Sequence, residues 1–116
     1  MKKTNMLKKN YEFKNVLSKG KYYSGFYIEA FIRKNKLIDK NLLGIAIGTK
    51  IAKATKRNHI KRLIRENYKN IENNLRTGYS IVFLWKKKMD IRNANYENIK
   101  KDIYIIFDKA GILSEE

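Results

Sequence analysis

Basic residues are concentrated in one stretch of this chain, residues 53–66, and their types suit the binding of phosphate groups. The sequence there is Lys-Ala-Thr-Lys-Arg-Asn-His-Ile-Lys-Arg-Leu-Ile-Arg-Glu, and three of the six arginines of the chain fall within it. An arginine guanidinium can bind phosphate through two parallel hydrogen bonds, and an asparagine amide can both donate and accept. The residues that we expect to contact a polyanion are Lys53, Lys56, Arg57, Asn58, Lys61, Arg62 and Arg65.

The element that must position these residues is a predicted helix over residues 55–76, with Thr55 as its N-cap. Starting at Ile60, apolar residues recur at i, i+3, i+4, i+8, i+11 and i+15. At 100° per residue they form a stripe about 140° wide. Arg62 and Arg65 lie with most of the other basic residues on the opposite side. The pattern therefore predicts a helix that buries one side and exposes a cationic one.

The charge at the start of this helix is unusual for a purely structural element. Lys53, Lys56 and Arg57 stand near the positive end of the helix dipole, which is mildly destabilising. A bound phosphate would remove this penalty, because the free N–H groups of a helix N-terminus also bind phosphate. The alternative is a solvated amphipathic helix whose charges only confer solubility. The i, i+4 pair of Arg62 and Glu66 is compatible with both interpretations.

Length and composition exclude several classes of function. A chain of 116 residues predicts one small domain, residues 1–116. With no cysteine and a single histidine, the chain lacks disulfides, thiolate zinc sites, cysteine nucleophiles and multi-histidine metal sites. We therefore expect no catalytic side chain, no metal site and no protein-bound cofactor. The aspartates are scattered, at Asp39, Asp90, Asp102 and Asp108, and Ser114-Glu115-Glu116 is predicted to be a solvated tail.

The net charge predicts a polyanionic partner. Lys and Arg number 27 against 11 Asp and Glu, which gives a formal net charge of +16. So large a charge on a small protein favours association with nucleic acid, with an anionic membrane as the second choice. No apolar run has the length of a signal peptide core or a transmembrane helix, so a cytoplasmic protein is expected.

Local patterns predict six elements in the order α-β-β-α-β-α. A polar connection over residues 34–41 is predicted to join the first two strands as a hairpin, and the third strand is predicted to be central because it is continuously apolar. Helices on one face of a small sheet would bury their apolar stripes. The predicted elements are a helix over 7–20 capped by Asn10, strands over 22–33 and 42–48, the helix over 55–76, a strand over 79–85, and a helix over 96–110 closed by Gly111.

Residues 53–66 resemble the signature of the protein subunit of bacterial ribonuclease P. Residues 7–20 are similar to the first helix of that family, and residues 44–51 fit its second strand and exit loop, so the resemblance covers residues 6–110. It implies an α+β fold with helices packed on a small mixed sheet, like the second domain of ribosomal protein S5. The family motif usually reads Arg-Asn-Arg, whereas this chain has Arg57-Asn58-His59.

The resemblance also implies that the protein binds RNA and that an RNA subunit carries out catalysis. The basic helix would bind a catalytic ribonuclease P RNA one to one. That RNA, with the substrate, would hold magnesium ions and remove the 5′ leader from precursor tRNA by phosphodiester hydrolysis. The single-stranded leader would lie in a cleft between the first helix and the sheet, where an exposed aromatic ring can stack an unpaired base. The positions that match this cleft are Phe13, Leu17, Phe31 and Lys50.

Several alternatives stay open from the sequence. Core packing is the alternative role for Phe13 and Phe31, and the lysines at 86–88 fit either an RNA contact or a solubilising turn. The sequence does not assign Tyr22, Tyr23 or Tyr27 to a site. For the whole chain, the main alternative is a ribosomal or other general RNA-binding protein without a catalytic role. A membrane-surface protein with a basic amphipathic helix and a nuclease active without RNA are further alternatives.

Overall fold

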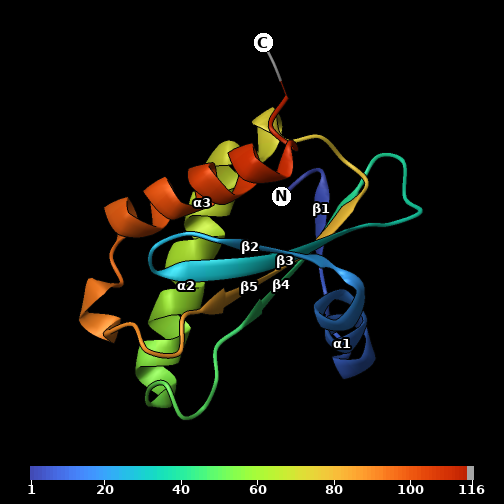
Figure 1. Ribbon diagram of the computed structural model, residues 1–116. Helices are drawn as coiled ribbons and strands as arrows, with labels where there is room; N and C mark the ends of the chain where they lie inside the picture. Colours follow the sequence, from blue (N-terminus) through green and yellow to red (C-terminus); the bar gives the residue numbers. More distant parts are fainter. Residues whose placement is uncertain (115–116) are drawn as a thin grey trace.

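The structure, a computed structural model, describes residues 1–114, in which five strands form one mixed sheet with three helices packed on it (Figure 1). The strands lie in the order β1-β4-β5-β3-β2. Residues 115–116 of the predicted acidic tail lie outside the described residues. The strands are β1 (Thr4–Met6), β2 (Lys21–Ser24), β3 (Ile28–Lys34), β4 (Asn41–Ala46) and β5 (Tyr79–Trp85). The helices are α1 (Asn10–Lys19), α2 (Ala54–Ile71) and α3 (Tyr96–Ala110), with short 3-10 turns η1 (Glu72–Asn74) and η2 (Ile91–Asn93).

The sheet order places β5 in the centre, as its apolar sequence predicts. It pairs in parallel with β4 and antiparallel with β3. The predicted hairpin across residues 34–41 is wrong, because β5 lies between β3 and β4 and takes the hydrogen bonds that a hairpin would use. The predicted α+β class and the order of the six predicted elements are confirmed, with two strands added.

The predicted strand over residues 22–33 is in fact two antiparallel strands, β2 and β3. Residues 25–27 form the turn between them, and the register places Tyr22 opposite Phe31. The stretch looks like one strand in the sequence because aromatic and β-branched residues continue through the turn.

A carboxylate from the other end of the chain closes this turn. Asp102 of α3 is fully buried, and a Cβ added at Gly25 would lie 2.5 Å from its Cγ, so this close approach requires glycine. The carboxylate accepts hydrogen bonds from the backbone N–H groups of Phe26, Tyr27 and Ile28, at 2.9, 2.6 and 2.9 Å. The hairpin therefore depends on α3, which explains why local pattern does not predict the turn.

No local pattern predicts β1, a three-residue strand at the edge of the sheet. It pairs in parallel with β4, and the end of α2 and η1 stabilise it further. The hydroxyls of Thr4 and Tyr68 share a 2.7 Å hydrogen bond, and the Glu72 carboxylate accepts the N–H groups of Lys2 and Lys3 at 3.2 and 3.3 Å. Buried polar groups thus attach the N-terminal segment to the helix.

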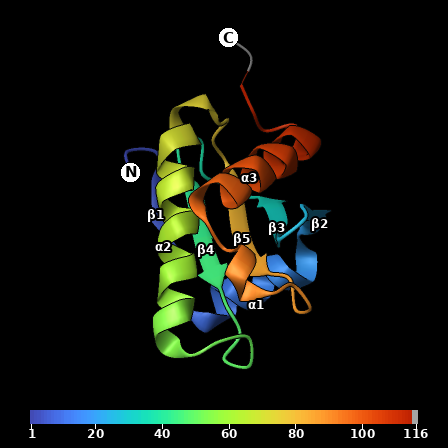
Figure 2. The same cartoon turned by 90° about the vertical axis from the view of Figure 1, so that its left-hand side faces the viewer.

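The two faces of the sheet are covered unequally. Figure 2 shows α2 and α3 in front of the sheet and α1 behind it. On β5, Ile81 and Phe83 join the larger core with α2 and α3, whereas Val82 joins a smaller cluster with α1. Because α1 spans only 10 residues, the end of its face near Leu84 stays open.

The N-caps of α1 and α2 differ from the predicted caps by one or two positions, and α2 ends at Ile71 rather than at the predicted residue 76, because the chain continues there as η1. Asn10 is the first residue of α1 and Lys9 is its N-cap. Lys53, rather than Thr55, is the N-cap of α2, since its backbone is extended and its carbonyl accepts the first bond of the helix at 2.9 Å. Gly111 ends α3 with a positive φ of 72°, as predicted.

Candidate nucleic-acid interface

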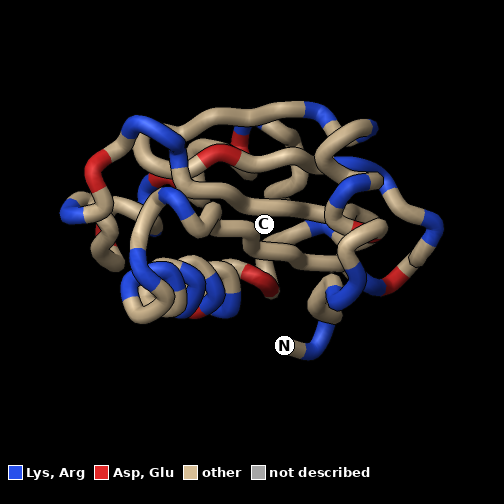
Figure 3. The backbone as a smooth tube through the Cα atoms, turned by 90° about the horizontal axis from the view of Figure 1, so that it is seen from below, with Lys and Arg blue, Asp and Glu red and all other residues tan. Residues whose placement is uncertain are grey.

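The helix α2 buries one side and exposes a cationic one, as its periodicity predicts. Ile60, Ile64 and Tyr68 are buried in the larger core, and Figure 3 shows far more basic than acidic residues along the helix, at lower left. The predicted phosphate-binding residues all lie on or just before this helix. Lys53, Lys56, Asn58, Arg62 and Arg65 are exposed and Arg57 and Lys61 are half-buried; these seven residues are the basic face.

Arg57 differs from the rest of the basic face because its guanidinium already has a partner in the protein. Its Nη1 donates to the carbonyl oxygen of Ala52 at 2.7 Å. This bond attaches the first turn of α2 to the loop over residues 47–53. Arg57 therefore has a structural role that its sequence motif does not reveal, whereas Arg62 is freely exposed.

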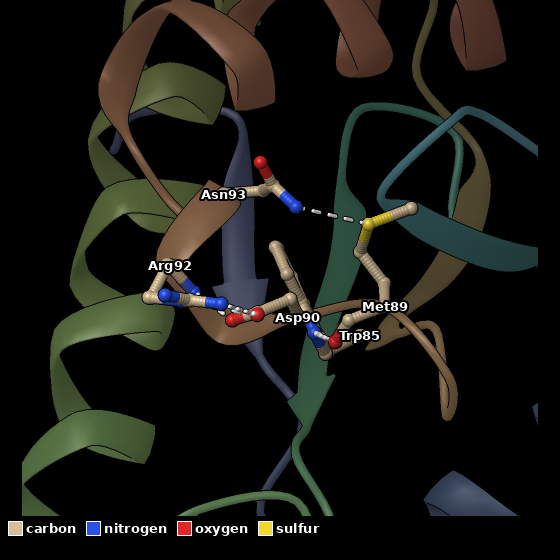
Figure 4. A network of polar contacts seen from close by, with 5 residues as sticks. All are labelled: Trp85, Met89, Asp90, Arg92 and Asn93. Atoms are coloured by element: carbon tan, nitrogen blue, oxygen red, sulfur yellow. Dashed lines mark hydrogen bonds and ion pairs between the residues drawn. The ribbon is translucent and has the colours of Figure 1, made fainter.

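His59 is exposed but lies beside the basic face, where it lines a small cavity together with Arg92 of η2. Figure 4 shows how the chain after β5 holds that arginine. The Trp85 indole N–H donates to the carbonyl of Met89 at 2.8 Å, and Arg92 donates to Asp90 from Nε and Nη2 at 3.0 and 2.7 Å. The side-chain hydrogen bonds from Arg92 hold the pKa of Asp90 below its usual range.

The other face of the sheet carries the residues predicted to bind a leader. Phe13 and Leu17 of α1 and Phe31 of β3 pack around Val82, and all three are half-buried. Phe13 lies directly on Gly44, where an added Cβ would come within 2.5 Å of the ring. These side chains therefore pack against the sheet and also keep part of their surface open to solvent.

Beyond α1, this face opens into a cavity of about 620 Å³. Its floor includes a row of adjacent residues on neighbouring strands, Glu29, Leu84 and Ala46. Lys50 and Lys87 also line it. Leu84 and Ala46 line this cavity and also belong to the smaller apolar cluster under α1. Lys50 therefore lies on the same face of the sheet as Phe13, Leu17 and Phe31. We call this region, with Phe13, Leu17, Tyr22, Glu29, Phe31, Lys50 and Lys87, the aromatic cleft.

Sequence reasoning missed Tyr22 and Glu29 of the aromatic cleft and left the role of Lys87 open. The Tyr22 ring lies 5.3 Å from the Phe31 ring, and its hydroxyl donates to Glu29 Oε2 at 2.6 Å, which raises the pKa of Tyr22. Alternation along β3 places Glu29 on the same face as Phe31, so this signal was present in the sequence. Tyr22 could be placed only with the hairpin register. Tyr23 and Tyr27 pack against the larger core instead.

Carboxylates do not gather into a metal site within residues 1–114, where no three His, Asp or Glu side chains come together. The buried Asp102 is instead occupied by backbone N–H groups, and Asp90 is paired with Arg92. In the same part of the chain, no helix is long and apolar enough to span a membrane.

The fold and the two surfaces define a class, the small basic α+β proteins that bind nucleic acid. A family model described as Ribonuclease P matches residues 1–111. A ribonuclease P protein component of Clostridium botulinum is 36% identical over 111 residues, which cover 95% of this chain and 97% of the relative. One from Fusobacterium nucleatum is 38% identical, covering 94% and 99%.

Solved structures agree with this match. The ribonuclease P protein of Staphylococcus aureus has a TM-score of 0.81 at 26% identity, covering 94% of this chain and 97% of that one. The protein of Thermotoga maritima has a TM-score of 0.76 at 25% identity, covering 86% and 92%. This chain therefore belongs to the ribonuclease P protein family, as its residues 53–66 suggest.

Proposed function

We propose that this chain binds the catalytic RNA of ribonuclease P through the basic face and the 5′ leader of precursor tRNA in the aromatic cleft. One protein would bind one RNA subunit, and the RNA would carry out phosphodiester hydrolysis. The observation that carries this proposal is the position of the two surfaces on opposite sides of one sheet. The loop over residues 47–53 joins them, with Lys50 at the cleft and Lys53 at the start of α2.

The side chains favour binding over catalysis as the role of the protein. The basic face offers ammonium, guanidinium and amide donors to phosphate, which form charge-assisted hydrogen bonds. The carboxylates of residues 1–114 are dispersed or occupied, so the described side chains do not fit a magnesium site. We therefore assign the magnesium ions to the RNA subunit and the substrate, and no catalytic side chain to this chain.

Reconstitution of cleavage tests the proposal. At low magnesium concentration, adding the protein to a bacterial ribonuclease P RNA should increase kcat/KM for precursor tRNA, because the basic face reduces repulsion between the two RNAs. Protein without RNA should not cleave the substrate, and cleavage by the protein alone would instead indicate a nuclease. A protein that binds the RNA but does not increase kcat/KM would be a general RNA-binding protein.

Aromatic residues of the cleft should contribute to binding of the leader. Phe13→Ala and Phe31→Ala should each weaken binding of leader-bearing precursor by about 1–3 kcal/mol, the usual contribution of a stacked base. Binding of mature tRNA should change little. Tyr104→Ala removes an exposed aromatic ring from α3 and is the matched control. An equal loss for precursor and mature tRNA would show that these rings only support the fold.

A further inference from the structure

The loop between β3 and β4, residues 35–40, carries two exposed aliphatic side chains, Leu37 and Ile38, which we call the apolar tip. In Figure 1 this loop projects from the end of the sheet, on the side away from α2. Ile38 is 91% exposed and Leu37 is 42% exposed. Neither residue packs against the two apolar clusters of the described residues. The apolar tip therefore leaves surface in water that a partner could cover.

Hydrogen bonds hold the apolar tip in this exposed position. The Thr77 hydroxyl donates to the carbonyl of Ile38 at 2.8 Å. Gly78 bonds to both sides of the loop, because its carbonyl accepts the N–H of Asn35 at 2.8 Å and its N–H donates to the carbonyl of Lys40 at 3.0 Å. The loop is thus already ordered, so a partner that binds the apolar tip pays little for fixing it.

Lysines lie on both sides of the apolar tip. Lys34 and Lys36 precede it and are exposed. Lys40 follows it and donates from Nζ to the carbonyl of Lys2 at 2.7 Å, which places the N-terminal segment beside the loop. Within residues 1–114, no carboxylate oxygen lies within 4.0 Å of a nitrogen of these lysine side chains, and Asp39 is the only acidic residue of the loop. Aliphatic surface and uncompensated positive charge therefore occur together here.

We propose that the apolar tip docks on an anionic lipid membrane, with its two side chains among the acyl chains and the nearby lysines on the lipid headgroups. Aliphatic side chains gain free energy on leaving water for hydrocarbon, but they do not stack on a base as an aromatic ring does. Residues 34–40 contain lysine and no arginine, and lysine attracts anionic lipid without the paired geometry that arginine offers to RNA phosphates. This chemistry favours a lipid surface over RNA at the loop.

The apolar tip lies at the opposite end of the sheet from the two proposed RNA-binding surfaces. Strands β3 and β5 run side by side from the pair Lys34 and Tyr79, next to the loop, to the pair Ile28 and Trp85. Trp85 lines the cavity of the aromatic cleft, about 20 Å away at the usual rise of a strand. The loop over residues 47–53, which leads into α2, lies at that far end as well. A protein docked through the apolar tip would therefore keep both surfaces available to RNA.

Vesicle binding by variants of equal charge tests the proposal. A net charge of +16 attracts the whole chain to any anionic surface, so the variants must not alter it. Ile38→Ser should weaken partitioning of the full chain onto vesicles of equimolar phosphatidylglycerol and phosphatidylcholine about tenfold, because its apolar contact is lost. Phe26→Ser is the matched control, since it removes a 72% exposed apolar side chain at the other end of β3 and should change partitioning little.

Fluorescence measures whether the apolar tip enters the hydrocarbon. Ile38→Trp places an indole at the tip, whereas the native Trp85 is buried and supplies a constant background. On the anionic vesicles, the emission of Ile38→Trp should shift to shorter wavelength and be quenched by brominated acyl chains. Phe26→Trp should show neither change. Thermal melts of each variant verify that it is folded.

Three outcomes would overturn the proposal. Equal partitioning of Ile38→Ser and the unmodified protein, or no quenching of Ile38→Trp, would show that charge alone holds the chain on the vesicle. An equal loss of partitioning in Ile38→Ser and Phe26→Ser would remove any special role of the loop. Weaker binding of ribonuclease P RNA by Ile38→Ser, with vesicle binding unchanged, would make the apolar tip an RNA contact. These measurements are independent of whether the chain assists cleavage of precursor tRNA.

Discussion

Three carboxylates in the structure differ in their partners and therefore in their roles. Asp102 and Glu72 are buried and accept backbone N–H groups, so they stabilise the fold. Glu29 lies on the open face and, within residues 1–114, accepts only from the Tyr22 hydroxyl. Because Glu29 retains a free acceptor, it is available to a ligand. The hydrogen-bond partners, rather than the acidic side chain itself, distinguish the two carboxylates that stabilise the fold from the one that keeps a free oxygen.

Tyr68 gives a prediction about stability against pH. Burial raises the pKa of Tyr68 above its ordinary value, and its hydrogen bond with Thr4 only partly opposes this shift. As the pH rises, the Tyr68 hydroxyl therefore ionises at a lower pH in the unfolded chain than in the folded protein. The free energy of unfolding falls as the pH rises above about 10. Near pH 8, Tyr68→Phe should be about 1 kcal/mol less stable, because it loses the hydrogen bond.

The difference in free energy of unfolding between the unmodified protein and Tyr68→Phe should decrease at higher pH, since the variant has no hydroxyl to ionise. Urea unfolding of both proteins at about pH 8 and about pH 11 measures the difference. A gap that stays constant across this range would show that Tyr68 does not contribute to alkaline unfolding.

Elements with strong local patterns are predicted well from this sequence, and elements that depend on distant partners are not. The apolar stripe of α2 and the continuous apolar run of β5 predict both elements and the central place of β5. The β2–β3 turn and β1 depend on Asp102 and Glu72, which are remote in sequence. In the candidate interface the predicted residues reach the expected faces, whereas Tyr22 required the strand register.

The turn between β2 and β3 gives a prediction at the scale of the element. Asp102→Ala leaves three backbone donors without their acceptor, so it should destabilise the protein by about 3 kcal/mol. Asp102→Asn keeps one acceptor oxygen and should cost less. Asp108→Ala changes an exposed aspartate of the same helix and should have little effect.

Hydrogen exchange measures where Asp102→Ala acts. The amides of residues 26–28 should exchange faster in the variant, because they lose their acceptor, while the amides of α2 should change only with global stability. Unaltered exchange at residues 26–28 would mean that the turn does not need the carboxylate.

Across the whole molecule, we expect the groups behind the +16 charge to contribute unequally to RNA binding. Arg62 and Arg65 are exposed on the basic face, whereas Arg57 is bonded to Ala52. Arg62→Ala with Arg65→Ala should therefore reduce the salt dependence of binding to ribonuclease P RNA by about two units of slope, close to one unit for each lost phosphate contact. Binding isotherms over a range of salt concentrations measure this slope.

A matched pair of lysines controls for net charge. Lys34 and Lys36 lie at the end of the sheet opposite the loop over residues 47–53, and both are exposed. Lys34→Ala with Lys36→Ala removes the same charge and should leave the slope nearly unchanged. An equal decrease for both double variants would indicate that RNA responds to the total charge and not to the basic face.

The central place of β5 also affects how the protein is made. Both β3 and β4 pair with β5 and not with each other. A nascent chain that ends before residue 79 therefore holds two apolar strands that lack their common partner. Docking of the sheet must wait until residues 79–85 have left the ribosome. Until then, the exposed strand edges are a target for chaperones or for aggregation.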